Sequence, residues 1–334
     1  MAAIAPPREN ESPAPAPRGL GTGPRPPGIF TDHLFRWIAL ASGLLVLAIL
    51  GLIAYTTTKN AWPWFREEGF GIFADNWDPA KGQYGAGAMI YGTFLVGIIA
   101  LLISVPISVG IALFVNEIAP RRLRKPIVYA VDLLAAIPSV VYGLWALYAL
   151  TPKPLFGVYD AISSATSGIP LISDLTADPN SSALSYMTAG IIVAIMITPI
   201  ITSLTREVFA TTPLSLKEAA YGVGATRWEM IRGAVFPHSR GGVVSAVIIG
   251  LGRAIGETIA VALLIGSSQH ISAHIFGPGD TLASIIANQF GESVGIQRAA
   301  LIGMGVVLLV LTVGVGILAR GIVGRYDRRA GGVA

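Results

Sequence analysis

The chain has 334 residues, of which 53% are hydrophobic and only 13% are charged, and it contains no cysteine. Roughly a quarter of the residues in a soluble domain are charged, so this composition excludes an ordinary soluble protein, and the lack of cysteine excludes disulfides and thiolate metal sites. The net charge of +4 is too small to indicate a nucleic-acid partner.

Long apolar runs predict an all-α polytopic membrane protein with six transmembrane helices. A run of 18 or more residues with few charges is long enough to cross a bilayer as a helix. The first such helix is predicted at 34–56, around the uncharged run that starts at Trp37. The others are predicted near 88–116, 127–150, 186–205, 241–266 and 299–319, all within a transmembrane domain at 88–320.

Basic residues predict the orientation of these helices. If the N-terminus is cytoplasmic, the inner segments contain 17 Lys and Arg and the outer segments contain 5. Basic loops resist translocation and stay in the cytoplasm. Both termini are therefore predicted to be cytoplasmic, and residues 321–334 to form a basic cytoplasmic tail.

Two segments outside the spans have a distinctive composition. The first 28 residues include eight prolines, so residues 1–33 are predicted to be a disordered cytoplasmic tail that cannot bury enough apolar area to fold. Residues 57–87 contain Trp62, Trp64 and Trp77 among other aromatics. This outer loop is predicted to form an interfacial belt or an ordered lip.

Local signatures of catalysis are missing from the sequence. It has no GxxxxGK[ST] loop, no HExxH and no GxSxG. His270 and His274 are four residues apart, but no carboxylate at ligand spacing accompanies them, so we expect surface histidines. We predict no cofactor, no metal site and no enzymatic activity, and any ATP must be hydrolysed by another chain.

The inner segment at 206–240 contains several signals for short helices. Pro213 after Thr212 predicts a helix start, and Gly222 or Gly224 can end that helix in the left-handed region. Thr226 and Glu229 predict a capping box for a second helix, which is expected to stop before Pro237. The segment is thus predicted to be two short helices joined by a glycine turn.

This segment resembles the EAA motif of the permease subunits of binding-protein-dependent ABC importers. The resemblance rests on Glu218, Ala219, Ala220, Gly224 and Pro237. The sequence departs from the family at Ala234 and Phe236, where Ile and Leu are usual, but both residues remain apolar. The resemblance implies the type I importer permease architecture and assigns these residues to a coupling helix that docks on an ATPase subunit.

Three further segments are similar to the phosphate-importing branch of this family. They lie at 84–93, 135–145 and 251–261, and the likeness extends over 31–325. It implies a multi-pass protein of the bacterial inner membrane that forms half of a phosphate pathway. The implied partners are a related permease subunit as heterodimer, ATPase subunits that carry ATP and Mg, and a phosphate-binding protein.

Arg253 and Glu257 lie four residues apart in the fifth predicted span. On one helix they would share a face and could form a salt bridge, and charges at this depth usually face a protein interior or a water-filled path. We predict that Arg253 contacts phosphate and that Glu257 limits how tightly it is held. The alternative is that the pair joins this helix to the partner subunit. Asp132 could cap a helix, form an ion pair with a basic residue of the inner loop, or contribute to a gate.

Other functions stay open at this level. A permease for sulfate or molybdate would carry a similar inner segment, although the segments at 135–145 and 251–261 favour phosphate. An ion-driven secondary transporter would need no ATPase, but it predicts an internal repeat that the sequence does not show. A role in signalling phosphate status is compatible with transport.

Overall fold

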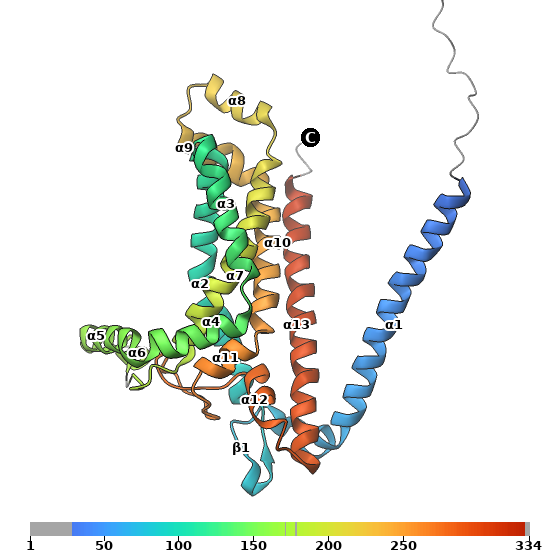
Figure 1. Cartoon of the computed structure of the whole chain (residues 1–334), viewed down its shortest axis with the longest axis vertical. Coiled ribbons are helices and arrows are strands. Elements are labelled where there is room, and N and C mark those ends of the chain that lie inside the picture. Colours follow the sequence, from blue (N-terminus) through green and yellow to red (C-terminus); the bar gives the residue numbers. More distant parts are fainter. Residues whose placement is uncertain (1–28, 171, 178, 331–334) are drawn as a thin grey trace, which may run out of the picture. The chain divides into compact units, whose positions relative to one another are not determined.

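The computed structural model describes residues 29–170, 172–177 and 179–330, and Figure 1 shows how their helices are arranged. The chain forms two units, Met1–Ala54 and Tyr55–Ala334. The described part is mainly helical, with five helices long and apolar enough to cross a membrane, or six if one bent pair counts as a span. The predicted all-α polytopic fold is therefore confirmed.

In the first unit, the described residues belong to helix α1 (Ile29–Glu68). This helix is apolar on all sides, and its side chains between Leu34 and Ile53 are mostly exposed, as expected for a helix that lies in a membrane. The predicted disordered tail is wrong for residues 29–33, which are helical. The remainder of that tail lies outside the described residues.

The second unit begins in the same helix and continues into a small ordered cap. After α1 come η1 (Gly69–Phe73), β1 (Trp77–Asp78), η2 (Pro79–Lys81) and β2 (Gln83–Tyr84), with Trp77 opposite Tyr84 in the antiparallel pair. The Trp64 indole N–H donates to the carbonyl oxygen of Tyr84 at 3.0 Å, and its ring is fully buried. The prediction of a loop at 57–87 is wrong for 57–68, which extend α1. Trp64 and Trp77 pack into a core, whereas Trp62 is 56% exposed.

Two helices form the centre of this unit, and glycine lets them approach closely. They are α2 (Gly87–Leu113), which continues through the π-helical turn η3 (Phe114–Ile118), and α7 (Tyr186–Ala210). A Cβ on Gly190 would overlap the side chain of Ile99, and the Ser108 hydroxyl donates to the Thr198 carbonyl oxygen at 3.1 Å. Small residues and interhelical hydrogen bonds are typical of packing between membrane helices.

The predicted third span at 127–150 is not one straight helix. It consists of α3 (Arg121–Ala136) and α4 (Ser139–Trp145), which meet at an angle of 89°. The break lies at Ile137 and Pro138, because a proline disfavours helical backbone at the residue before it, and Ile137 is extended. The π-helical η4 (Ala146–Leu155), α5 (Phe156–Thr166) and α6 (Ile172–Thr176) follow.

The predicted fifth span at 241–266 also has different bounds. Helix α9 (Arg227–Met230), the π-helical turn η5 (Ile231–Val235) and α10 (Phe236–Ile255) form one candidate span that ends at Ile255. A short α11 (Ile259–Leu264) follows after a break. The unit is completed by α12 (Leu282–Gln289) and α13 (Gly295–Ala330). Residues 321–330 of the predicted tail are thus helical.

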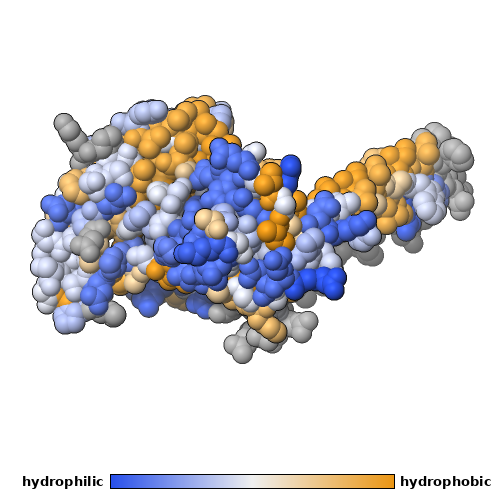
Figure 2. Space-filling model, turned by 90° about the horizontal axis from the view of Figure 1, so that it is seen from below, coloured by the Kyte–Doolittle hydropathy of each residue, from blue (hydrophilic) through white to orange (hydrophobic). Residues whose placement is uncertain are grey.

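The second unit has two distinct ends. One, here called the α8 end, carries α8 (Leu214–Gly222) and α9, and the other, the hairpin end, carries β1 and β2 (Figure 1). Figure 2 is seen from the hairpin end and shows hydrophilic residues over much of that end face, with hydrophobic residues along the flank. This distribution fits a body whose flank lies in lipid and whose hairpin end meets water.

Candidate functional site

The glycine turn predicted in the inner segment is confirmed at Gly224. Helix α8 begins after Pro213 and ends at Gly222, and Gly224 then adopts φ +86°. The Gly224 amide donates to the Tyr221 carbonyl oxygen at 2.9 Å, and the Ala225 amide donates to that of Ala220 at 3.1 Å. A residue with a Cβ is strained in this conformation, so Gly224 sets the direction in which the chain leaves α8.

The predicted capping box is confirmed as well. The Glu229 amide donates to the Thr226 hydroxyl, and the Glu229 carboxylate accepts from the Thr226 amide at 2.8 Å. The expected stop before Pro237 is wrong, because the helix continues through this residue into α10. The π-helical turn η5 ends at Val235 and contains Gly233, four residues before Pro237. Such a wider turn accommodates the proline ring, which would otherwise clash with the carbonyl of that residue.

The inner segment is fixed to the bundle by contacts that the sequence did not reveal. Met230, Ile231 and Val235 pack against Phe209 of α7 and Ala112 of α2 in one buried cluster. The Lys217 ammonium of α8 lies 2.6 Å from the carboxylate of Glu117 in η3. No local signal could have paired residues 100 positions apart, so this ion pair is a finding of the structure.

The other face of the segment is open. Glu218 and Ala219 are exposed, whereas Ala220 is half-buried against the cluster around Phe209. The apolar side chains that surround the glycine turn are exposed too, with Val223 at 86% and Trp228 at 62%. Exposed apolar patches are typical of surfaces that contact a protein or a membrane.

The structure does not place Arg253 and Glu257 on one helix, so the predicted salt bridge is wrong. Helix α10 ends at Ile255, and Gly256 caps it. Arg253 lies in the last turn and is exposed, while Glu257 follows the cap and is half-buried. No ion pair joins them in the part of the chain that the structure describes. A helix C-terminus favours a cation in its last turn, which accounts for the position of Arg253.

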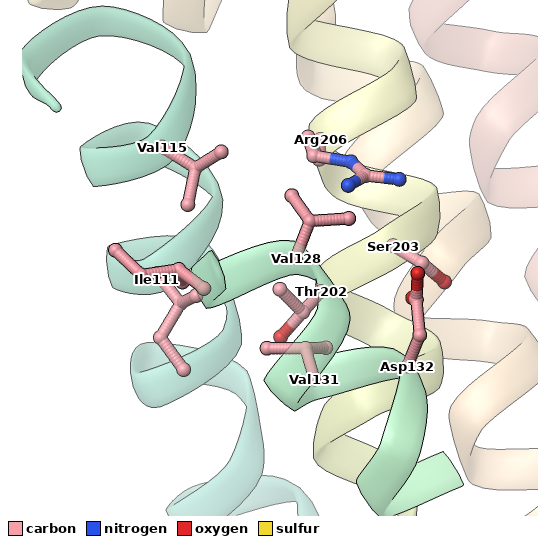
Figure 3. A pocket seen from close by; sticks show the side chains of 9 residues that line it. Ile111, Val115, Val128, Val131, Asp132, Thr202, Ser203 and Arg206 are labelled. Carbon is pink, nitrogen blue, oxygen red and sulfur yellow. The ribbon is translucent and has the colours of Figure 1, made fainter. Parts of the chain in front are cut away.

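Asp132 lies beside a small cavity between α2, α3 and α7, which Figure 3 shows. Its carboxylate points toward Ser203, and Arg206 of α7 lies at the same cavity. The Thr202 hydroxyl, which lines it too, is buried without a hydrogen-bond partner. The volume is about 10 Å³, enough for a single water molecule. The cavity in this structure is therefore too small to hold an oxyanion.

A second polar cluster, which the sequence did not indicate, lies at the start of α12. Asp280 is 1% exposed, and the Ser284 hydroxyl donates to its carboxylate. Burial raises the pKa of Asp280 to about 6 against the opposing effect of this hydrogen bond. The hydroxyl of Tyr186, at the start of α7, is buried without a hydrogen-bond partner. The Leu282 amide donates to the Thr93 hydroxyl of α2 at 3.0 Å, and the Tyr186 ring lies against Gly279, so the cluster joins the start of α12 to α2 and to the first turn of α7.

Comparisons with known proteins agree with this architecture. The alginate importer of a bacterium, solved with its alginate-bound periplasmic protein, has a TM-score of 0.61 at 16% identity, covering 89% of this chain and 98% of that one. An inward-facing structure of the MetNI methionine ABC transporter has a TM-score of 0.53 at 18% identity, covering 75% of this chain and 99% of that one. At these identities the likeness concerns the fold alone.

Sequence relatives are much more similar to this chain. The phosphate transport system permease protein PstC of Mesorhizobium japonicum is 42% identical over 303 residues, covering 90% of this chain and 92% of that protein. PstC 2 of Mycobacterium tuberculosis is 38% identical, covering 88% and 92%. The family model for the inner membrane component of binding-protein-dependent transport systems matches residues 105–331. The chain therefore belongs to the permeases of binding-protein-dependent transport systems, and within them to the family of phosphate transport system permease proteins.

Proposed function

We propose that the chain is the permease subunit of an ATP-driven importer of inorganic phosphate and forms half of its translocation pathway. Family membership gives the class of transporter, and phosphate is carried over from the relatives named above. The structural observation that supports a coupled transporter is the unbroken helical path from the capping box at Thr226 to Arg253. ATP hydrolysis then belongs to a separate subunit.

In this proposal α8 and the glycine turn dock on the ATPase. The exposed carboxylate of Glu218 and the exposed apolar side chains of Val223 and Trp228 provide the contact surface. The α8 end is then cytoplasmic, and the hairpin end receives phosphate from its binding protein. The remaining partners are a second ATPase subunit and a related permease, which completes the pathway.

The same helical path carries movement from the ATPase to the substrate. Close packing supports a rigid connection, because a Cβ on Gly250 would lie 2.6 Å from the side chain of Ile201. Closure of the ATPases would shift α8 together with the glycine turn and α9, and α10 would move with α9 because no break separates α9 from α10. The nucleotide thus biases the permease between inward and outward arrangements.

Arg253 is the residue that we assign to phosphate. Its guanidinium is exposed at the end of α10 and offers a planar fork of donors that suits an oxyanion. Glu257 is not paired with it in this structure, so the guanidinium is free to meet the anion. In the cycle, Glu257 would compete for Arg253 and prevent phosphate from being retained, as release requires.

Reconstitution of the complete complex in vesicles tests the function. Phosphate presented by its binding protein should stimulate ATP hydrolysis and uptake, whereas sulfate and molybdate on their own binding proteins should not. Stimulation by sulfate or molybdate instead would assign another oxyanion. Uptake that persists without the ATPase subunits would rule out a coupled importer.

The role of Arg253 is tested by Arg253→Gln with Arg240→Gln as the matched control. Both arginines are exposed on α10. The two substitutions therefore remove the same charge from exposed side chains of the same helix. We expect Arg253→Gln to abolish phosphate uptake while the complex still assembles, and Arg240→Gln to retain uptake. Loss of assembly in Arg253→Gln would instead favour the alternative that this residue joins the two permeases.

A further inference from the structure

A basic cluster at the start of α3 has no role in the function proposed above. It consists of Arg121, Arg122, Arg124 and Lys125, all exposed, and the first turn contains no acidic residue. Glu117, the nearest carboxylate in the sequence, is engaged by Lys217. Between residues 29 and 330, as far as the structure describes them, no ion pair neutralises this cluster.

One member of the cluster holds the helix in place, and the others remain available. Arg124 donates to the carbonyl oxygens of Ala119 and Asn116, both at 3.0 Å. These carbonyls lie at the end of the preceding helix, so Arg124 fixes the start of α3 against the end of η3. Arg121, Arg122 and Lys125 lie in the first two turns of α3, and their side chains are exposed.

The orientation of α3 follows from its two faces. Val128, Val131 and Asp132 line the cavity against α2 and α7 (Figure 3). Arg122, Lys125, Tyr129 and Leu133 follow one another at spacings of three and four residues, which places them on one face. Tyr129 is 65% exposed and Leu133 is 69% exposed, so this face, here called the α3 stripe, is directed away from the cavity.

The order of residues along the α3 stripe matches the layers of a membrane. At about 1.5 Å per residue, Leu133 lies about 16 Å along the helix from Arg122. Basic side chains come first, at the α8 end, followed by a tyrosine and then a leucine. Basic residues bind anionic lipid headgroups, tyrosine prefers the interface and leucine the acyl chains. A protein partner would not require this order.

We propose that the α3 stripe binds an anionic phospholipid, with Arg122 and Lys125 of the stripe and the neighbouring Arg121 of the first turn around its headgroup phosphate, and Tyr129 and Leu133 along its acyl chain. This placement rests on the proposed cytoplasmic side of the α8 end, but binding itself does not. The bound lipid would fix the depth of α3 in the membrane, next to the helix end that Lys217 of α8 contacts.

Native mass spectrometry of the full chain in an uncharged detergent tests this proposal, with phosphatidylglycerol as the probe and phosphatidylcholine for comparison. The variant R121Q/R122Q/K125Q is matched by K59Q/R66Q/K81Q, which removes the same charge from exposed residues in the hairpin-end half of the chain. A basic residue near an anionic surface contributes about 1 kcal/mol, or about fivefold in affinity. We expect the first variant to lose at least tenfold in phosphatidylglycerol affinity and the second to keep it.

Three results would overturn the proposal. They are unchanged phosphatidylglycerol binding in R121Q/R122Q/K125Q, equal binding of phosphatidylcholine, and displacement of the lipid by inorganic phosphate at millimolar concentration, which would indicate a site for the free anion. The conservative variant R121K/R122K keeps the positive charge of the cluster and should bind phosphatidylglycerol as the natural chain does. If R121Q/R122Q/K125Q binds lipid normally but no longer captures the ATPase subunit, the cluster is a protein contact. None of these outcomes depends on which anion is transported.

Discussion

Lys217 of α8 and Glu117 of η3 form an ion pair of 2.6 Å that joins the exposed inner segment to the end of α2. The side chains are only 18% and 8% exposed, so both charges are largely withdrawn from water. Such a pair adds little net stability, but the loss of one partner leaves an uncompensated charge. The position of α8 relative to the central helices therefore depends on both residues.

Glu117→Gln should destabilise the chain by about 3 kcal/mol, the low end for a broken buried pair, because Lys217 keeps some access to water. Thermal unfolding in detergent measures the loss. In the assembled transporter, phosphate-stimulated ATP hydrolysis should fall more than basal hydrolysis, since α8 is no longer held to α2. E117Q/K217Q removes both charges and should recover most of the stability. A Glu117→Gln variant as stable as the natural chain would contradict a structural role for the pair.

Gly224→Ala should impair coupling without preventing membrane insertion. The left-handed backbone at φ +86° costs a residue with a Cβ about 1–2 kcal/mol, which favours another turn and a different direction of α8. Gly222→Ala is the control, because Gly222 is helical and a Cβ there would meet no atom within 4 Å. ATP hydrolysis by the reconstituted complex should lose phosphate stimulation only in Gly224→Ala. Equal behaviour of the two variants would show that the turn does not set coupling.

Signals that act within a few residues were readable from the sequence. The capping box of Thr226 and Glu229 and the turn at Gly224 depend on neighbours at most four positions away. Pro138 ended a helix as proline should, whereas Pro237 did not, because the preceding π-helical turn relieves its clash. A proline by itself therefore does not decide whether a helix ends there or continues, because the backbone before it matters too.

Contacts between distant segments were out of reach. The i, i+4 spacing of Arg253 and Glu257 predicted a salt bridge, but the helix ends at Ile255. An apolar run gives no sign of where a helix breaks inside it. The burial of Asp280 depends on the packing of α12 against other helices, and an aspartate in a loop would ordinarily be expected in water.

Gly92→Ala should destabilise the chain strongly. A Cβ at Gly92 would overlap the backbone carbonyl oxygen of Asp280, and backbone cannot move aside as a flexible side chain can. The loss expected is in the range of overpacked cores, about 1–3 kcal/mol. Gly110→Ala on the same helix is the control, because its Cβ would meet no atom within 4 Å. Thermal unfolding in detergent should separate the two, and equal midpoints would show that α2 and the start of α12 are not in close contact.

Asp280 should give the chain a stability that declines as the pH rises through the range from about 4 to about 6. The pKa of its carboxyl is raised from 3.8 to about 6, chiefly by burial. In this window the folded chain binds more protons than the unfolded chain, so the free energy of unfolding decreases with pH. At about 1.4 kcal/mol per pKa unit, ionising the buried group costs about 3 kcal/mol, and this cost is fully present above pH 6.

Asp280→Asn should remove this cost, since an amide oxygen can still accept from the Ser284 hydroxyl without becoming charged. We expect the variant to unfold at a higher temperature than the natural chain at pH 7.5, with a much smaller difference at pH 4.5, where Asp280 is largely protonated. Asp160→Asn provides the control, because Asp160 is exposed on α5. A variant that is less stable than the natural chain at pH 7.5 would mean that the ionised carboxylate has a stabilising partner. Phosphate uptake measured on the same preparations would then show whether that partner belongs to the transport pathway.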